Sequence, residues 1–483
     1  MARTRKIQAR TTVPAVLTTF ALLAAGCGSD DDGAEVDSAQ QETVDSAATG
    51  DDTEEAVEES NDEPAPDAGT TINVAIVGNP QMEDIVSLTP EQYTADSGIA
   101  VEYTILEEQT LREIVTREAG AEGDTFDVVM IGAYEAPQFG DNGWILNLND
   151  FADGDADYAK DDILPTVLSA LSVDGNQYAS PFYAESSFVM YRADLLEAAG
   201  QTMPDAPTWD EVAEIARAVD SDETAGICLR GKPGWGDLGA SFTTVLNTFG
   251  GTWWEANEDG TIGAAQVDQP EFREALEFYV SLAQDAGEPD AANSSFGECL
   301  SLYQDGKVAM WYDATVASGI LEADDSPVQG QNGFALAPVK ETDGSGWFWS
   351  WSLAIPQNAA NADAAWDYIS WATGPQYLET AGEELGWAQV PPGTRQSLYD
   401  NSSYQEASAN FGQQSLDAIL NANPDDPGTT PRPGLPGVQY VGVPEFQDVG
   451  TRCTELFSAV IADSMSIDDA LADCQIIASE ASA

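Results

Sequence analysis

The chain has 483 residues, with 84 Asp and Glu, 17 Lys and Arg, no His and a formal net charge of −67. Without His, the sequence excludes Ser-His-Asp and Cys-His nucleophile systems and any His-ligated metal. So negative a chain disfavours nucleic acid and anionic lipid head groups as partners. At roughly 150 residues per domain, its length predicts two or three domains.

Residues 1–26 have the composition of a signal peptide for export. Basic residues without any acid occupy positions 1–10, and a short apolar run follows over 11–25. The run is shorter than the ~20 residues that a membrane-spanning helix needs. It ends in Leu-Ala-Ala-Gly-Cys at 23–27, which resembles a bacterial lipobox and implies lipidation of Cys27. The alternative is an ordinary secretory signal with an incidental cysteine.

Residues 27–69 are predicted to form an acidic tether after the lipidated cysteine. Positions 29–67 contain 16 acids and neither a basic nor an aromatic residue. Such a segment cannot bury enough apolar surface to offset the entropy of ordering it. We therefore expect a self-repelling, extended linker between a membrane anchor and the folded part.

Four cysteines remain in the folded part, and an even number in an exported protein favours two disulfides. Three connectivities are possible. Cys453 and Cys474 lie in neighbouring C-terminal segments and form the favoured pair, which leaves Cys228 with Cys299 by elimination. Free buried thiols are the alternative.

The folded part alternates strand-like and helix-like patterns, which predicts an α/β fold with mostly parallel sheets. Strands are expected over 71–78, 98–106, 126–132, 225–230, 305–312 and 333–339, and helices over 111–119, 237–249, 270–286 and 362–374. Thr208 and Glu211 have the spacing of a capping box, which predicts a further helix over 211–219.

The residues after these strands carry the first functional signal, because open α/β sheets bind ligands beyond the carboxyl ends of their strands. The segments 78–83, 132–139, 230–236, 311–315 and 349–353 are rich in aromatic and polar residues. Aromatic walls with carboxylate, amide and guanidinium partners suit an uncharged polyhydroxy ligand. Trp144, Trp253, Trp254, Trp366 and Trp371 are instead expected in the core.

From about residue 70 onward the chain resembles the extracellular solute-binding proteins of ATP-driven sugar importers, and within them the sorbitol/mannitol (polyol) branch. The motifs that carry the resemblance are FDVVMIGAYEAPQFGDNGWILNL (126–148), YASPFYAESSFVMYRADLLEAAG (178–200), MPDAPTWDE (203–211), GICLRGKPGWG (226–236), GKVAMWYDATVASG (306–319), WSWSLAIPQNA (349–359) and GWAQVPPGTRQSLY (386–399).

This resemblance implies a two-lobed periplasmic-binding-protein-like fold (type II) with a ligand cleft between the lobes. Residues 70–184 and 350–400 would form lobe 1, and residues 185–349 and 401–483 would form lobe 2. The chain would cross between lobes near 181–187, near 349–353 and around residue 400.

The resemblance also implies a set of ligand-binding residues: Asn79, Gln81, Tyr134, Glu135, Glu185, Arg230, Trp235, Asp313, Trp351, Trp387 and Phe446, with Tyr440 as a further late aromatic. Some have structural alternatives. Glu135 could pair with Arg112, Asp313 could cap the helix that begins near Ala314, and Arg230 could form an ion pair within its lobe.

The implied function is capture of a polyol, or of a related sugar, outside the cell and delivery to the permease of an ABC importer. We expect no catalysis, cofactor or metal, and a monomer held by its lipid anchor on the outer face of the cytoplasmic membrane. One alternative is a secreted carbohydrate-active enzyme with paired carboxylates. Others are a binding protein for another mono- or oligosaccharide, and an adhesin or chemoreceptor domain.

Overall fold

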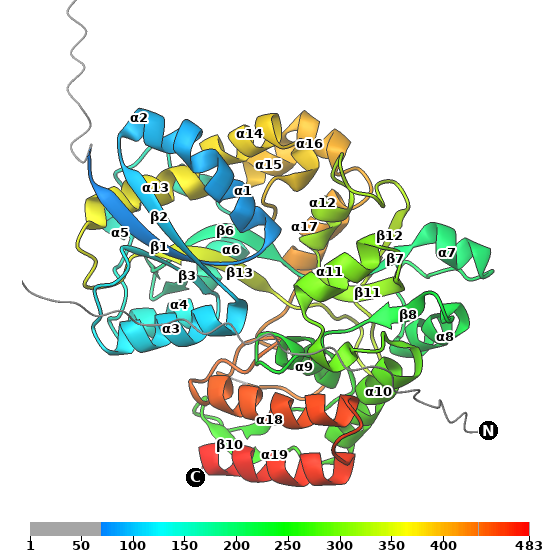
Figure 1. Cartoon of the computed structure of the whole chain (residues 1–483). Helices are drawn as coiled ribbons and strands as arrows, with labels where there is room; N and C mark the ends of the chain where they lie inside the picture. The colour runs from blue at the N-terminus through cyan, green and yellow to red at the C-terminus, as the bar shows by residue number, and fades with distance from the viewer. Residues whose placement is uncertain (1–68, 433, 483) are drawn as a thin grey trace, which may run out of the picture. The chain divides into compact units, whose positions relative to one another are not determined.

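The computed structural model describes residues 69–432 and 434–482. The predicted signal peptide, the lipidation site Cys27 and the acidic segment 29–67 lie outside the described residues. Within the described part, the chain has the two-lobed α/β architecture that the resemblance implied, with one larger sheet in each lobe (Figure 1).

The first sheet has the strand order β2-β1-β3-β13-β6 and the second has the order β12-β7-β11-β8. The first is built from β1 (Thr71–Val77), β2 (Ala100–Leu106), β3 (Val128–Gly132), β6 (Ser180–Glu185) and β13 (Trp349–Ala354). The second is built from β7 (Ser187–Arg192), β8 (Ala225–Cys228), β11 (Val308–Ala314) and β12 (Asn332–Leu336). Two short hairpins pair β4 (Ser172–Val173) with β5 (Asn176–Gln177), and β9 (Trp254–Ala256) with β10 (Ile262–Ala265).

Both larger sheets are mixed, which corrects the expectation of mostly parallel sheets. Strand β1 runs parallel to β2 and β3, but β13 runs antiparallel to β3 and β6. In the second sheet, β7 is antiparallel to both of its neighbours. The chain leaves the first sheet through β6, separated from β7 only by Ser186, and returns through β13. Strands that leave and return side by side must run in opposite directions.

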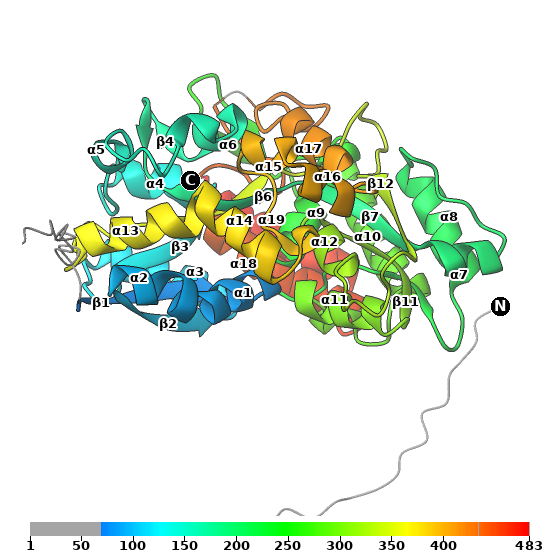
Figure 2. The same ribbon diagram turned by 90° about the horizontal axis from the view of Figure 1, so that it is seen from above.

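The helices of the described chain are α1 (Pro80–Thr89), α2 (Ala95–Ser97), α3 (Glu108–Gly120), α4 (Glu135–Asp141), α5 (Asn149–Ala152), α6 (Pro165–Ala170), α7 (Ala193–Ala198), α8 (Trp209–Val219), α9 (Leu238–Thr248), α10 (Pro270–Ala286), α11 (Phe296–Gln304), α12 (Ala317–Leu321), α13 (Ala362–Thr373), α14 (Pro375–Glu384), α15 (Gln396–Asp400), α16 (Ser402–Ala407), α17 (Gly412–Asn421), α18 (Glu445–Ile461) and α19 (Ile467–Ala481). Helices α3 and α4 lie on one side of the first sheet and α13 on the other (Figure 1). Figure 2 shows α13 and α14 following one another along that sheet.

Local sequence signals explain where several helices begin. The Thr208 hydroxyl accepts a hydrogen bond from the Glu211 amide at 3.2 Å, and the Glu211 carboxylate accepts one from the Thr208 amide at 2.8 Å. This confirms the predicted capping box at the start of α8. Helix α10 begins at Pro270, where a proline loses no intrahelical bond.

One buried apolar cluster extends through both lobes, and a smaller one lies against the second sheet. The smaller cluster contains Trp311 and the disulfide between Cys228 and Cys299, whose Cα atoms are 5.7 Å apart. A second disulfide joins Cys453 of α18 to Cys474 of α19. Among the described helices, none combines the length and apolar character needed to cross a membrane.

Candidate ligand-binding cavity

A cavity of about 410 Å³ lies between the two sheets and is lined by residues of both. From the first lobe come the residues after β1, the start of α3 and the indole side chains of β13. From the second lobe come residues 230–237 after β8, the start of α11 and the end of β11. The volume is in the range of small-molecule sites, and the lining combines aromatic and charged side chains.

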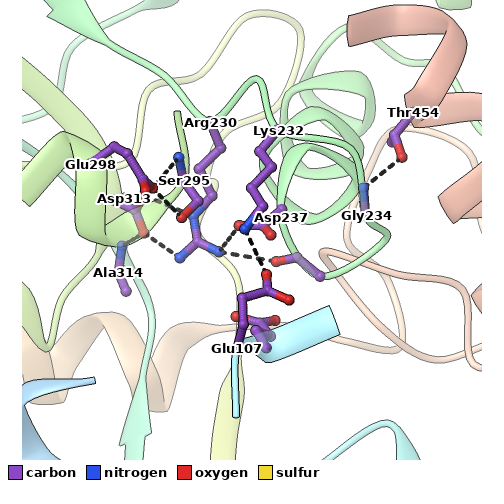
Figure 3. Close-up of polar contacts among 12 residues, drawn as sticks. Glu107, Arg230, Lys232, Gly234, Asp237, Ser295, Glu298, Asp313, Ala314 and Thr454 are labelled. Atoms are coloured by element: carbon purple, nitrogen blue, oxygen red, sulfur yellow. Dashed lines mark hydrogen bonds and ion pairs between the residues drawn. The ribbon is translucent and has the colours of Figure 1, made fainter. Parts of the chain in front are cut away.

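Arg230 is a buried cation on the second-lobe side of the cavity (Figure 3). Its Nε and Nη2 donate to the two carboxylate oxygens of Asp313, at 2.9 and 2.7 Å. Its Nη1 donates to the Gly236 carbonyl at 3.0 Å and lies 3.6 Å from Asp237. Burial opposes the charge, but Asp313 raises the pKa of the guanidinium well above its ordinary value. Arg230 therefore stays charged and is held in one orientation.

Arg112 of α3 is the corresponding buried cation on the first-lobe side. Its Nε and Nη2 donate to Glu108 at 3.2 and 2.8 Å, and its Nη1 donates to Glu135. Three indoles surround its Cζ atom, with ring centroids 4.2, 4.7 and 4.6 Å away for Trp235, Trp349 and Trp351. Such cation–π contacts stabilise a desolvated guanidinium. Arg112 thus joins one indole of the second-lobe loop to two indoles of β13.

Glu185, at the end of β6, is a carboxyl group of the lining for which no protein donor is found within the described residues. Its side chain is buried, with 6% of its surface exposed, and within the described residues it makes no hydrogen bond or ion pair. Burial raises the pKa of its carboxyl well above the ordinary value, and the charge of Arg230 offsets this only in part. Glu185 is thus a hydrogen-bond acceptor that lines the cavity and could bind a donor group of a ligand.

Besides the contact of Arg112 with Trp235, two approaches between polar or charged residues cross the cavity from one lobe to the other. Lys232 donates to Glu107 at 2.7 Å across the gap, and both side chains are partly exposed (Figure 3). Deeper in, Gly236 approaches Glu108 so closely that a Cβ at this position would lie 2.3 Å from the carboxylate oxygen. Burial and the Glu108 charge raise the pKa of Asp237 to about 8. The inner contact therefore brings two carboxyl groups of opposite lobes near each other.

Six of the residues predicted for the site lie in the lining: Asn79, Gln81, Glu185, Arg230, Trp235 and Trp351. Asn79 caps α1 by accepting from the Met82 amide, and its Nδ2 donates to the Tyr183 hydroxyl at 3.0 Å. The Trp235 ring is almost wholly buried beneath Arg112 and Tyr134. The ring therefore packs against the Arg112 guanidinium and offers little free surface on which a ligand could stack.

Five predicted residues lie outside the lining: Tyr134, Glu135, Asp313, Trp387 and Phe446. Tyr134 donates to the Val443 carbonyl, and Phe446 packs behind Trp235 with ring centroids 6.1 Å apart. Trp387 lies over Gly382 of α14, where a Cβ would meet the indole at 2.6 Å.

Glu135 and Asp313 are engaged by protein partners in place of a ligand. Glu135 pairs with Arg112 and accepts from the Gly132 amide at 2.9 Å. Asp313 is fully buried, and besides Arg230 it accepts from Trp311 Nε1 and the Ala314 amide. The pairing of Glu135 with Arg112 is the structural alternative given above. Asp313 instead pairs with Arg230, and the expected helix cap is wrong because Ala314 ends β11 and α12 begins only at Ala317. Each carboxylate positions an arginine that does face the cavity.

Sequence reasoning did not name Glu107, Glu108, Lys232, Asp237, Trp349 and Phe296 as site residues, although Lys232 and Trp349 lie in the segments 230–236 and 349–353 that it singled out. The rule of strand ends could have found the first two, because they directly follow β2. The same rule pointed to 132–139, which the cavity does not reach. The Trp349 indole lies over Gly132, where a Cβ would be 1.8 Å from the ring, and covers the end of β3.

Within the described residues, the side chains that could jointly hold a metal are Cys228, Cys299 and Glu288. The disulfide occupies both sulfur atoms, so no thiolate is free to act as a ligand there.

Residues 79–379 match the family of bacterial extracellular solute-binding proteins. The chain is 39% identical to a mannitol-binding protein of Pseudomonas aeruginosa over 84% of this chain and 91% of that protein. It is 27% identical to an erythritol/L-threitol-binding protein of Mycolicibacterium smegmatis, over 71% and 74% of the two chains. The solved structure of an ABC transporter solute-binding protein from Agrobacterium vitis S4 with bound D-mannitol is also similar, with a TM-score of 0.81, 44% identity and coverage of 85% of this chain and 98% of that one.

Proposed function

The chain belongs to the family of bacterial extracellular solute-binding proteins, and we propose that it captures an uncharged linear polyol of the hexitol type for an ABC importer. The observation that carries the proposal is the lining of the cavity. Indole rings of β13 line the cavity together with the buried acceptor Glu185 and the oriented donor Arg230. A polyol presents C–H groups to the first kind of surface and hydroxyl groups to the second.

The similarity to a mannitol-binding protein and to a mannitol-bound structure supports this ligand class. In the proposed complex, Glu185 accepts hydrogen bonds from hydroxyl groups of the ligand, while Arg230 and Asn79 donate hydrogen bonds through their N–H groups. Asp313 and Glu135 do not contact the ligand in this complex. They orient Arg230 and Arg112 through ion pairs.

The proposal includes export and anchoring. The signal-like segment and the lipobox-like 23–27 support lipidation of Cys27. The lipid and the acidic tether would hold a monomeric body at the outer face of the membrane, with lobes divided as 70–184 with 350–400, and 185–349 with 401–483. Labelling with a fatty-acid probe should mark the wild-type protein and not Cys27→Ala.

The proposed activity is binding without catalysis, so the ligand should leave the protein chemically unchanged. The alternative, glycoside hydrolysis, needs one free acid and one free base on either side of a bond. Around this cavity, Glu108, Glu135 and Asp313 are engaged by arginines. Incubation with polyols and oligosaccharides followed by NMR of the recovered ligand separates the two. A new product would contradict the proposal.

The direct test is isothermal titration with D-mannitol, sorbitol, ribitol and erythritol, beside amino acids and oligopeptides. We expect the hexitols to bind most tightly. A ligand at 100 times its Kd should raise the free energy of unfolding by about 2.7 kcal/mol. Arg273→Ala, an exposed arginine of α10 outside the cavity lining, is the control variant and should bind like the wild type. Tightest binding of an amino acid or peptide would contradict the proposed ligand class.

A further inference from the structure

More carboxyl groups than guanidinium groups surround the cavity. Arg112 and Arg230 are the buried cations, and they are surrounded by Glu108, Glu135, Asp237, Asp313 and Glu185. Each guanidinium is already held by two carboxyl groups other than Glu185. These five carboxyl groups face two guanidiniums, and Lys232 at the cavity edge is already paired with Glu107. Some of the five must therefore retain protons or receive positive charge from a ligand.

Among these carboxyl groups, Glu185 is the one that lines the cavity without a protein partner among the described residues. It lines the cavity, is more than nine-tenths buried and makes no hydrogen bond or ion pair within the described chain. Gln81 lines the same cavity, and its buried Oε1 also lacks a donor among the described residues. Glu185 and Gln81 thus offer acceptors that suit a ligand group with several N–H or O–H bonds. Trp235 and Trp347 of the same lining offer indole N–H donors without an acceptor among the described residues.

The charged groups near Glu185 do not satisfy it. Arg230 is the cation whose charge acts on Glu185, but its Nε and Nη2 donate to Asp313 and its Nη1 donates to Gly236, so none of these three hydrogen bonds reaches Glu185. Asp313 and Glu108 both act on Glu185 with negative charge. A primary ammonium has three donors and one positive charge, so it would satisfy Glu185 and reduce the local excess together.

We propose that the cavity also binds protonated amino-alditols, linear polyols with a terminal ammonium group, and that Glu185 receives the ammonium. This inference rests on the proposed polyol function. The remaining hydroxyl groups would occupy the positions used by a neutral hexitol. An aldonate of the same length should bind poorly, because it adds a carboxylate where both buried cations are already paired.

The test is isothermal titration of the wild type at neutral pH with 1-amino-1-deoxy-D-mannitol, D-mannitol and D-mannonate. We expect the amino-alditol to bind at least as tightly as D-mannitol, and D-mannonate at least tenfold more weakly than D-mannitol. An amino-alditol that binds tenfold or more weakly than D-mannitol would overturn the inference while leaving the proposed function intact. If no neutral polyol binds, the proposed function itself fails.

Proton release gives a second readout that does not depend on affinity. Burial favours the neutral form of Glu185 in the empty cavity, so an ammonium should displace its proton whereas D-mannitol should not. The apparent enthalpy of amino-alditol binding should then vary with the ionisation enthalpy of the buffer.

Glu185→Gln should abolish that variation and weaken amino-alditol binding at least tenfold relative to D-mannitol. Glu214→Gln removes an exposed carboxylate of α8 outside the cavity lining and should change neither. Equal losses for both ligands in Glu185→Gln would contradict the role of Glu185. The wild-type comparison stands on its own if this variant fails to fold.

Discussion

Arg112 and Arg230 are both buried guanidiniums beside the cavity, but they are held in different ways. Arg230 is bound through two of its nitrogens by Asp313, and its neighbour Glu185 is unpaired. Arg112 is shared between Glu108 and Glu135, and indoles surround it. Arg230 has one carboxylate in hydrogen-bond contact and a second, Asp237, 3.6 Å away, whereas Arg112 has two carboxylates in hydrogen-bond contact and three indoles around it. The difference suggests that Arg230 serves the ligand and that Arg112 mainly holds the cavity wall together.

Removal of the carboxylate partner should show this difference most strongly. Asp313→Ala leaves Arg230 buried with only Asp237 as a distant partner, and we expect the free energy of unfolding to fall by about 3–5 kcal/mol. Glu135→Ala should cost less, because Glu108 and the indoles still stabilise Arg112. Urea denaturation of the ligand-free variants measures both losses. Equal losses of unfolding free energy in the two variants would mean that Arg112 and Arg230 depend equally on these carboxylates.

Replacement of each arginine by lysine should separate ligand binding from stability. Lysine cannot form the paired contacts of a guanidinium. We expect Arg230→Lys to weaken hexitol binding roughly tenfold to a hundredfold, because charged hydrogen bonds contribute about 1.5–3 kcal/mol each. Arg112→Lys should mainly lower stability, because its contacts are to Glu108, Glu135 and the indoles. Calorimetric titration beside thermal melts tests both. A larger loss of affinity in Arg112→Lys would reverse the assignment.

The sequence predicted much of this arrangement through one rule, that ligands lie beyond strand ends. The rule led to Asn79, Gln81, Arg230 and Trp235, which do line the cavity. It could not foresee that the Trp349 indole covers the end of β3, because that contact joins residues more than 200 positions apart. For the same reason it could not tell which carboxylates would face an arginine.

The strand directions show a similar limit. The local patterns located β1, β2, β3, β8, β11 and β12 to within a few residues. Strand β13 pairs antiparallel with β3 and β6 because of the path that the chain takes between the lobes. The local pattern of apolar residues carries no information about that path. No strand was predicted over β6 or β7, and the family resemblance implied only a crossing between the lobes near 181–187. Local periodicity thus predicted the elements, while the direction of pairing came from long-range topology.

The pH dependence of stability should probe the surroundings of Arg230 further, because Asp237 lies 3.6 Å from this guanidinium and its pKa is raised by burial and by the charge of Glu108. Its pKa is raised from 3.8 to about 8 in the folded protein, so folding binds a proton that the unfolded chain releases near pH 4. Stability from this group is complete below about pH 4 and is lost as the pH rises toward 8. Asp237→Asn should flatten this decline. Urea denaturation between pH 5 and 9 checks it, and an unchanged slope in the variant would contradict the assignment.

The ion pair between Lys232 and Glu107 should have the smallest effect, although it is the contact that most visibly joins the two lobes. Both side chains are partly exposed, with 33% and 44% of their surface accessible. Water and salt therefore screen their attraction, and exposed pairs contribute about 0.2–1 kcal/mol. We expect Lys232→Met to weaken hexitol binding less than about fivefold, with the difference shrinking further in 0.5 M salt, whereas the loss in Arg230→Lys should persist there. Titrations at two salt concentrations measure this. A loss in Lys232→Met that equals the loss in Arg230→Lys would show that closure across the gap, and not the buried arginine centre, determines affinity.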